Sequence, residues 1–183
     1  MNDEPQPPSI RGQYAQHGVA GYYAAAGDAY RNPHEDCARF ALAQAVRRWS
    51  LDLSHVLDLA CGSGEMTLEL RDLGAGEIVG VDPYTAAAYR GRIGRDALQF
   101  TFAEIAAGAL AGRSYSLIVC SYALHLEEPS RLPSLLHALG QISGALLILS
   151  PHKRPQLDPA WGWRLVDEIY PQRVRTRLYQ RDQ

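Results

Sequence analysis

The stretch HVLDLACGSGEMTLEL, residues 55–70, restricts the fold of this chain more than any other part of the sequence. Residues 55–60 form an apolar run that predicts a buried strand, because parallel strands covered on both faces are almost continuously apolar. Gly62 and Gly64 permit a sharp turn, and the pattern from Glu65 onward predicts a helix. A strand, a glycine turn and a helix in this order form the first half of a βαβ unit.

The same alternation of strand and helix patterns continues along the chain. Strands are predicted at residues 55–60, 77–82, 98–104, 115–121 and 144–150, and helices at residues 37–49, 65–73, 84–93 and 130–142. Strands that alternate with helices at this spacing pair in parallel and carry helices on both sides. The predicted fold class is therefore α/β, with a Rossmann-like open sheet that is mostly parallel and has helices on both faces.

The alternation of strand and helix ends after Ser150. Residues 164–171 and 173–180 form two alternating runs joined by a short link, and they predict an antiparallel hairpin at the edge of the sheet. Arg173, Arg175 and Arg177 alternate along the second run. This arrangement is typical of a charged, protected edge strand, and a homodimer interface is the alternative role of the same surface.

The length of 183 residues fits one domain with a full core. Residues 1–13 are rich in proline and acidic residues, which predicts a disordered tail. Residues 14–183 are predicted to form a single domain. We divide it into an N-terminal helical lid at 14–50, a ligand-binding core at 51–150, and a linker with the edge hairpin at 151–183.

The composition excludes several classes of protein. A formal net charge of −2 opposes a role in gripping nucleic acid, since such domains are usually strongly basic. No apolar run approaches the roughly 20 residues that cross a bilayer, and the N-terminus lacks the apolar core of a signal peptide. We therefore expect a cytoplasmic protein without a membrane partner. The three cysteines form no C-x-x-C pair, so no metal site is predicted.

The residues at the predicted strand ends indicate the ligand. In an open parallel sheet, ligands bind beyond the carboxyl ends of the strands. Asp82 ends the second strand 24 residues after Asp58, close to the spacing at which an acid receives ribose hydroxyls. The third glycine of a dinucleotide fingerprint is missing here, and Glu65 would face a pyrophosphate with like charge. The only lysine, Lys153, is far from the turn, which opposes a phosphate loop. A cationic nucleoside without phosphate, such as S-adenosylmethionine, fits better.

Four motifs carry a resemblance to a known family. VLDLACGSGEMT at 56–67, IVGVDPY at 78–84, FTFAEI at 100–105 and YSLIVCSYALHLEE at 115–128 resemble, in order and spacing, the motifs of the class I S-adenosylmethionine-dependent methyltransferases of the small-molecule type. Two departures are Ala60, where the family often has glycine, and Glu104, where aspartate is commoner.

The resemblance implies a set of cofactor-binding residues. Asp58, Gly62 and Gly64 would line the methionine moiety, and Asp82 would hold the ribose. Tyr84 would lie against the adenine, and Glu104 would contact its edge. The same motifs and the preceding lid segment add further expected cofactor contacts: Ala60, Cys61, Pro83, Ile105, Ser121 and Tyr30.

The loop after the fourth predicted strand is expected to face the transferred methyl group. Methyl transfer needs proximity, alignment and, for a protonated acceptor, a base. His125 is the predicted base, because an unperturbed imidazole titrates near pH 6.5. The expected acceptor contacts are Tyr22, Tyr23, His34, Tyr122 and His152. No Asn/Asp-Pro-Pro-Tyr motif follows the strand, which opposes the methylases of nucleic acids and protein glutamine that resemble that pattern.

Three functions remain open from the sequence. The first is an enzyme that methylates a small molecule on O, N or C. The second is a catalytically silent protein that binds S-adenosylmethionine and completes or regulates another protein. The third, an NAD-dependent dehydrogenase, is disfavoured by the missing third glycine.

Overall fold

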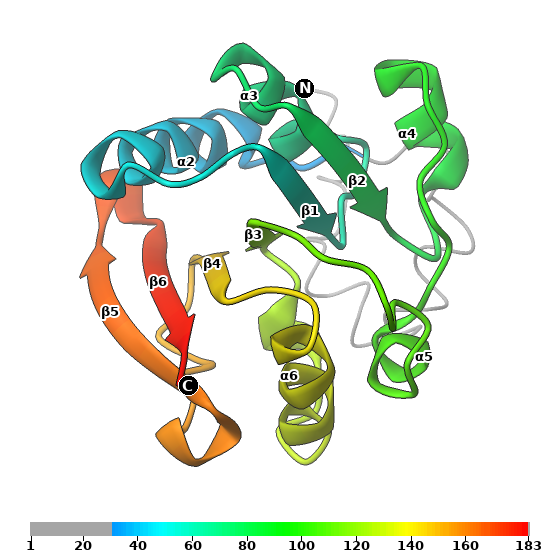
Figure 1. Ribbon diagram of the computed structural model, residues 1–183. Helices are drawn as coiled ribbons and strands as arrows, with labels where there is room; N and C mark the ends of the chain where they lie inside the picture. Colours follow the sequence, from blue (N-terminus) through cyan, green and yellow to red (C-terminus); the bar gives the residue numbers. More distant parts are fainter. Residues whose placement is uncertain (1–30, 183) are drawn as a thin grey trace, which may run out of the picture.

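The computed structural model describes residues 31–182, in which six strands form one sheet with helices on both faces (Figure 1). The strand order is β2-β1-β3-β4-β6-β5, and the first four strands in that order are parallel. The antiparallel strands β6 and β5 complete the sheet. This arrangement confirms the predicted Rossmann-like sheet with an antiparallel C-terminal hairpin. In chain order the helices and strands are α2 (Glu35–Trp49), β1 (His55–Leu59), α3 (Glu65–Asp72), β2 (Glu77–Val81), α4 (Ala86–Ile93), α5 (Phe102–Ala106), β3 (Leu117–Ser121), η2 (Leu124–Leu126), α6 (Leu132–Gly140), β4 (Ala145–Ser150), η3 (Pro159–Trp161), β5 (Trp163–Ile169), η4 (Pro171–Arg173) and β6 (Arg175–Arg181).

The central strands are covered on both faces. Successive side chains of a strand point to opposite faces. On β1, Val56 packs in the cluster formed with α2 and α3, whereas Leu57 and Leu59 pack in the cluster formed with α5 and α6. Strands β3 and β4 divide their side chains between the two clusters in the same way. This double burial is the physical reason that these runs are apolar almost throughout.

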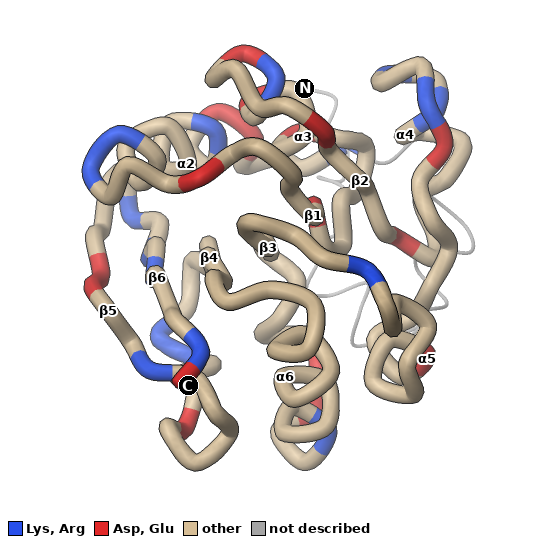
Figure 2. The backbone as a smooth tube through the Cα atoms, in the orientation of Figure 1, with Lys and Arg blue, Asp and Glu red and all other residues tan. Residues whose placement is uncertain are grey.

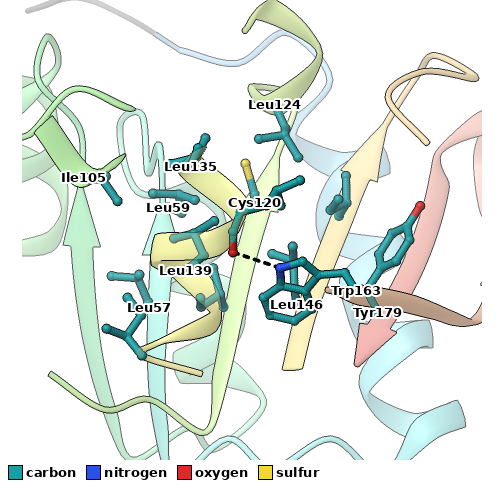
Figure 3. Close-up of a cluster of buried hydrophobic side chains, with 14 of the residues drawn as sticks. Leu57, Leu59, Ile105, Cys120, Leu124, Leu135, Leu139, Leu146, Trp163 and Tyr179 are labelled. Carbon is teal, nitrogen blue, oxygen red and sulfur yellow. Dashed lines mark hydrogen bonds between the residues drawn. The ribbon is translucent and has the colours of Figure 1, made fainter. Parts of the chain in front are cut away.

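Trp163 of β5 closes the cluster on the α6 side. Its side chain is 1% exposed, and its indole N–H donates to the carbonyl oxygen of Leu136 in α6 at 3.0 Å (Figure 3). Tyr179 of β6 and Leu146 of β4 lie beside it. The hairpin is thus joined to the core by a large aromatic side chain whose polar atom has a partner.

Arg177 is buried, although the alternating arginines of the second hairpin strand were expected to form a charged, protected edge. Strand β6 lies between β4 and β5, so β5 is the edge strand. The Arg177 side chain is 1% exposed, and it forms an ion pair with Glu168 on β5. Arg175 pairs with the same carboxylate at 2.9 Å, and Figure 2 shows the basic residues of β6 beside acidic residues of β5. Alternation of charge along β6 therefore reflects pairing across the hairpin for these two residues.

The predicted strand at residues 98–104 is also wrong. Leu98 makes a single parallel bridge to Val81, and residues 99–104 contain no strand. Thr101 instead starts α5 through a capping box, in which its hydroxyl accepts from the Glu104 N–H and the Glu104 carboxylate accepts from the Thr101 N–H. These reciprocal bonds satisfy backbone donors at the helix start. The local capping signal overrides the alternating pattern, and β2 becomes an edge of the sheet.

Other expectations concern parts that the structure leaves undescribed or untested. The predicted tail at 1–13 and residues 14–30 of the predicted lid at 14–50 lie outside the described residues, so the domain division stays a prediction. Within residues 31–182, no helix is long and apolar enough to cross a membrane. All three cysteines are free, and the described residues contain no cluster of His, Cys, Asp and Glu that could hold a metal ion.

Candidate functional site

The turn between β1 and α3 has an unusual backbone. Ala60, Gly62 and Gly64 have φ angles of 58°, 56° and 91°. An L-residue rarely adopts this left-handed region, so Ala60 is a strained position of the kind that occurs at functional sites. At Gly64 a Cβ atom would lie 2.5 Å from the side chain of Ile93 in α4. The sequence therefore needs glycine here for both the turn and the packing of α4.

Asp82 joins this turn to the segment after β2. Its Oδ2 atom accepts from the Gly62 N–H at 3.2 Å, and its Oδ1 atom accepts from the N–H groups of Tyr84 at 2.8 Å and Thr85 at 3.1 Å. The Thr85 hydroxyl donates to the Gly62 carbonyl at 2.7 Å. A carboxylate has about four acceptor positions, so one remains for a ligand hydroxyl. Asp82 also lines the adjoining cavity, as a ribose-binding residue must.

Asp58 lies behind the same turn and is buried. Its Oδ2 atom accepts from the Thr67 hydroxyl at 2.6 Å, whereas its Oδ1 atom has no hydrogen-bond partner among the described residues. Burial raises the pKa of the Asp58 carboxyl to about 7, and the nearby charges of Glu65 and Asp82 add to this. A buried acceptor without a partner is costly, which indicates that a ligand supplies one.

A cavity of about 390 Å³ opens beyond the ends of β1, β2 and β3. This volume lies within the range of small-molecule sites. Seven residues predicted from the sequence line it: Ala60, Gly62, Asp82, Pro83, Tyr84, Ser121 and Tyr122. Other parts of the wall were not predicted from the sequence: Phe100, Thr101, Phe102, Ala103, Leu126, Glu127 and Arg131.

Several predicted cofactor contacts are not in the lining of this cavity. The Glu104 carboxylate is directed back to Thr101, where it accepts from the backbone N–H and the hydroxyl, both at 2.8 Å. Ile105 lies in the core cluster with α6, and Cys61 is buried against Tyr89 of α4. The sequence did contain a signal for this segment. The Thr-x-x-Glu pattern of a capping box predicts that a helix begins at Thr101, which lines the cavity. The cofactor contacts proposed for Glu104, Ile105 and Cys61 stay predictions.

The loop after β3 brings the predicted acceptor residues together. His125 is more than half buried, and its Nδ1 atom has no partner among the described residues. Its ring meets that of His152 edge-on, with centroids 4.6 Å apart. Burial lowers the pKa of His125 to about 4, and the His152 charge adds to the effect. Tyr122, with φ of 57°, stacks on His34 at 5.6 Å.

Glu65 joins the first described residues to the glycine turn. Its Oε1 atom accepts from the Asn32 N–H at 3.0 Å and from the Ser63 hydroxyl at 2.6 Å. Arg92 of α4 lies 3.7 Å from the same oxygen. The segment that precedes α2 is therefore held at the start of α3. Tyr22, Tyr23 and Tyr30 lie outside the described residues, so their proposed contacts remain predictions.

The unpartnered buried atoms of the described residues gather at one edge of the sheet. Three of the four, Asp58 Oδ1, Ser121 Oγ and His125 Nδ1, lie at or just beyond the ends of β1 and β3. Unsatisfied polar atoms are rare in folded proteins, so their concentration beside the cavity indicates a ligand site. Two carboxylates and a largely apolar wall fit a nucleoside that carries positive charge and no phosphate.

Comparisons with known proteins agree with this geometry. Residues 56–142 match a protein family described as a methyltransferase domain. The chain is 38% identical over 199 aligned residues to uncharacterized protein C17A5.05c of Schizosaccharomyces pombe, covering 86% of this chain and 80% of that protein. It is 32% identical over 105 residues to ribosomal protein L11 methyltransferase of Cupriavidus necator, covering 56% of this chain but only 33% of that enzyme. The structure of magnesium protoporphyrin IX methyltransferase from Synechocystis PCC 6803 with bound S-adenosylmethionine aligns over 100% of both chains, with a TM-score of 0.60 and 15% identity.

Proposed function

The chain belongs to the class I S-adenosylmethionine-dependent methyltransferases, and from this premise we propose that it methylates a small organic molecule. The acceptor atom is a nucleophilic oxygen, nitrogen or carbon, and His125 is the base that removes its proton. One observation carries this proposal: the half-buried His125 imidazole, whose Nδ1 atom has no partner among the described residues, lies in the loop after β3 between the cavity-lining residues Ala123 and Leu126.

The cofactor is S-adenosylmethionine. When bound, it supplies a methyl carbon made electrophilic by the attached sulfonium. In the proposed arrangement, Asp82 accepts from one ribose hydroxyl through its remaining acceptor position. Tyr84 and the wall segment Phe100–Ala103 enclose the flat base, since both line the cavity. Enclosure of this kind excludes water and fixes the cofactor relative to the loop after β3.

His125 is available as a base over the whole neutral range. Its pKa of about 4 keeps the imidazole uncharged above about pH 5, so it does not need to lose a proton first. Tyr122 and His152 belong to the same rim, and burial raises the pKa of the Tyr122 hydroxyl to about 12. Tyr122 and His125 are therefore both uncharged at neutral pH, which suits an organic acceptor better than a polyanion.

The experiment that tests this function is an acceptor screen. We would incubate the purified protein and tritium-labelled S-adenosylmethionine separately with small-molecule, protein and RNA fractions of a cell extract. We expect label in the small-molecule fraction, and at least a 100-fold lower rate for His125→Asn, as for the loss of a general base. His137→Asn is the matched control, because His137 is an exposed histidine on α6.

Other outcomes of the screen have definite meanings. Label in the protein or RNA fraction would overturn the small-molecule assignment. Binding of the cofactor without transfer to any fraction would instead support the catalytically silent partner. An unchanged rate for His125→Asn would remove the base from the proposal, because transfer would then need alignment only.

A further inference from the structure

Three buried groups from three elements form a chain of hydrogen bonds behind the glycine turn. The Thr67 hydroxyl of α3 lies 2.6 Å from Asp58 Oδ2 of β1 and 3.1 Å from the Tyr89 hydroxyl of α4. The three side chains are 1%, 1% and 2% exposed for Asp58, Thr67 and Tyr89. A threonine hydroxyl has one proton. When Asp58 is ionised, Thr67 donates that proton to Oδ2, and Tyr89 must therefore donate to Thr67.

The packing of α4 holds this chain of hydroxyls in place. Tyr89 lies so close to β2 that a Cβ atom at Gly80 would approach its ring and hydroxyl to 2.6 Å. Because Gly80 has no side chain, the Tyr89 ring can pack directly against the backbone of β2. Because the ring is fixed, its hydroxyl fixes Thr67, and Thr67 fixes one oxygen of Asp58. The other oxygen, Oδ1, is left without a partner among the described residues.

We propose that Thr67 and Tyr89 are positioning residues, which hold Asp58 by Oδ2 so that Oδ1 can accept from the ammonium group of the cofactor. The inference rests on the cofactor and on these three side chains. It is independent of the acceptor and of His125.

The groups around Asp58 predict that the carboxyl carries a proton near neutral pH and releases it when the cofactor binds. The groups that face it are the hydroxyls of Thr67 and Tyr89, the carboxylates of Glu65 and Asp82, and the thiols of Cys61 and Cys120. None of these six groups is cationic. Burial and the two carboxylates raise the Asp58 pKa to about 7, whereas the Thr67 hydrogen bond opposes the rise. A cation at Oδ1 would lower this pKa, so its binding releases the proton.

The affinity for the cofactor should depend on pH. A proton on Asp58 competes with the ammonium group, so affinity for the cofactor rises with pH up to about 7 and then levels off. The number of protons released per cofactor bound should fall from nearly one at pH 6 to about half at pH 7. Loss of the Thr67 hydroxyl raises the Asp58 pKa further, and the levelling point then moves to higher pH.

Calorimetric titration with two ligands tests the proposal. S-adenosylhomocysteine has the ammonium group, whereas 5′-methylthioadenosine shares the nucleoside and lacks the amino-acid part. For Thr67→Val we expect affinity for S-adenosylhomocysteine to fall about tenfold at pH 7, with affinity for 5′-methylthioadenosine unchanged within about twofold. Tyr89→Phe should give the same pattern with a smaller loss. Thr176→Val is the matched control, because Thr176 is a buried threonine on β6, away from the cavity lining.

Proton release is measured by repeating the titrations in buffers of different ionisation enthalpy between pH 6 and 7. Release should occur with S-adenosylhomocysteine, and be absent with 5′-methylthioadenosine and in Asp58→Asn. Equal weakening of both ligands by Thr67→Val would mean a merely structural role and would overturn the proposal. The same release with both ligands would overturn it too. Failure of both ligands to bind the unmodified protein would instead count against the cofactor site itself.

Discussion

Replacement of Arg177 by methionine is expected to lower the free energy of unfolding by about 3–5 kcal/mol, because it breaks a buried ion pair. The Arg177 guanidinium pairs with Glu168 and donates to the carbonyl oxygens of Pro155 at 3.0 Å and Lys153 at 2.9 Å. Methionine fills a similar volume but satisfies none of these acceptors. Urea denaturation followed by tryptophan fluorescence measures the loss.

Arg175 provides the matched control for this prediction. It lies two residues away on β6, pairs with the same carboxylate of Glu168, and has a side chain that is 22% exposed. Because water and salt screen an accessible pair, Arg175→Met should cost about 0–1 kcal/mol. Equal losses for the two variants would show that burial of Arg177 contributes nothing, contrary to the structure. Arg177 donates to carbonyl oxygens of the loop that also carries His152. Arg177→Met should therefore also disturb the position of His152.

Replacement of Gly64 by alanine is the second change with a large expected effect, about 2–5 kcal/mol. Two costs add here. The left-handed backbone at Gly64 disfavours any Cβ atom by about 1–2 kcal/mol. The added methyl group would also lie 2.5 Å from Ile93, and such overpacking costs about 1–3 kcal/mol. Thermal and urea denaturation measure the sum, and cofactor titration should show weakened binding because the turn shifts.

Gly74 separates the two costs. Its φ angle of 84° is similar, but a Cβ atom there would meet nothing within 4 Å. Gly74→Ala should therefore cost only the backbone strain and leave cofactor binding unchanged. If Gly64→Ala destabilised the protein no more than Gly74→Ala, the close contact between the turn and α4 would be contradicted.

The parts of the fold that the sequence predicted well are those in which local pattern and tertiary environment agree. The run at residues 55–60 is apolar because β1 is covered on both faces. The prediction failed at residues 98–104, where Thr101 and Glu104 form a local capping box that starts α5. A rule based on alternation alone cannot weigh such a signal, although both capping residues are visible in the sequence.

Charge patterns were harder to interpret. The alternating arginines near the C-terminus were expected to form a charged, protected edge. A sequence alone does not say which strand of a hairpin is the edge strand. In the structure β6 is internal, and Arg177 is buried with Glu168. The pairing depends on register across the hairpin, which places Glu168 opposite Arg177. Register of this kind is a tertiary property that neither strand reveals alone.

The candidate site was predictable where it depends on strand ends. Asp58 and Asp82 come together because β1 and β2 are parallel neighbours that end at the same edge of the sheet. The wall contributed by α5 was missed because residues 98–104 were predicted to be a strand, and Glu127 and Arg131 were missed because they lie in a connection without a repeating pattern. Asp58 Oδ1 and His125 Nδ1 have no partner among residues 31–182, which is likewise a product of packing that no sequence motif could indicate.

The most direct test of the central claim is calorimetric titration of the purified protein with S-adenosylmethionine, S-adenosylhomocysteine and NAD, repeated on Asp82→Asn. Asp96→Asn is the control, since Asp96 is an exposed acid paired with Arg90. We predict micromolar binding of the first two ligands to the unmodified protein and to the control, no binding of NAD, and loss of binding in Asp82→Asn. Unchanged binding in Asp82→Asn, or binding of NAD in place of the other two, would contradict the cofactor site described at the ends of β1 and β2.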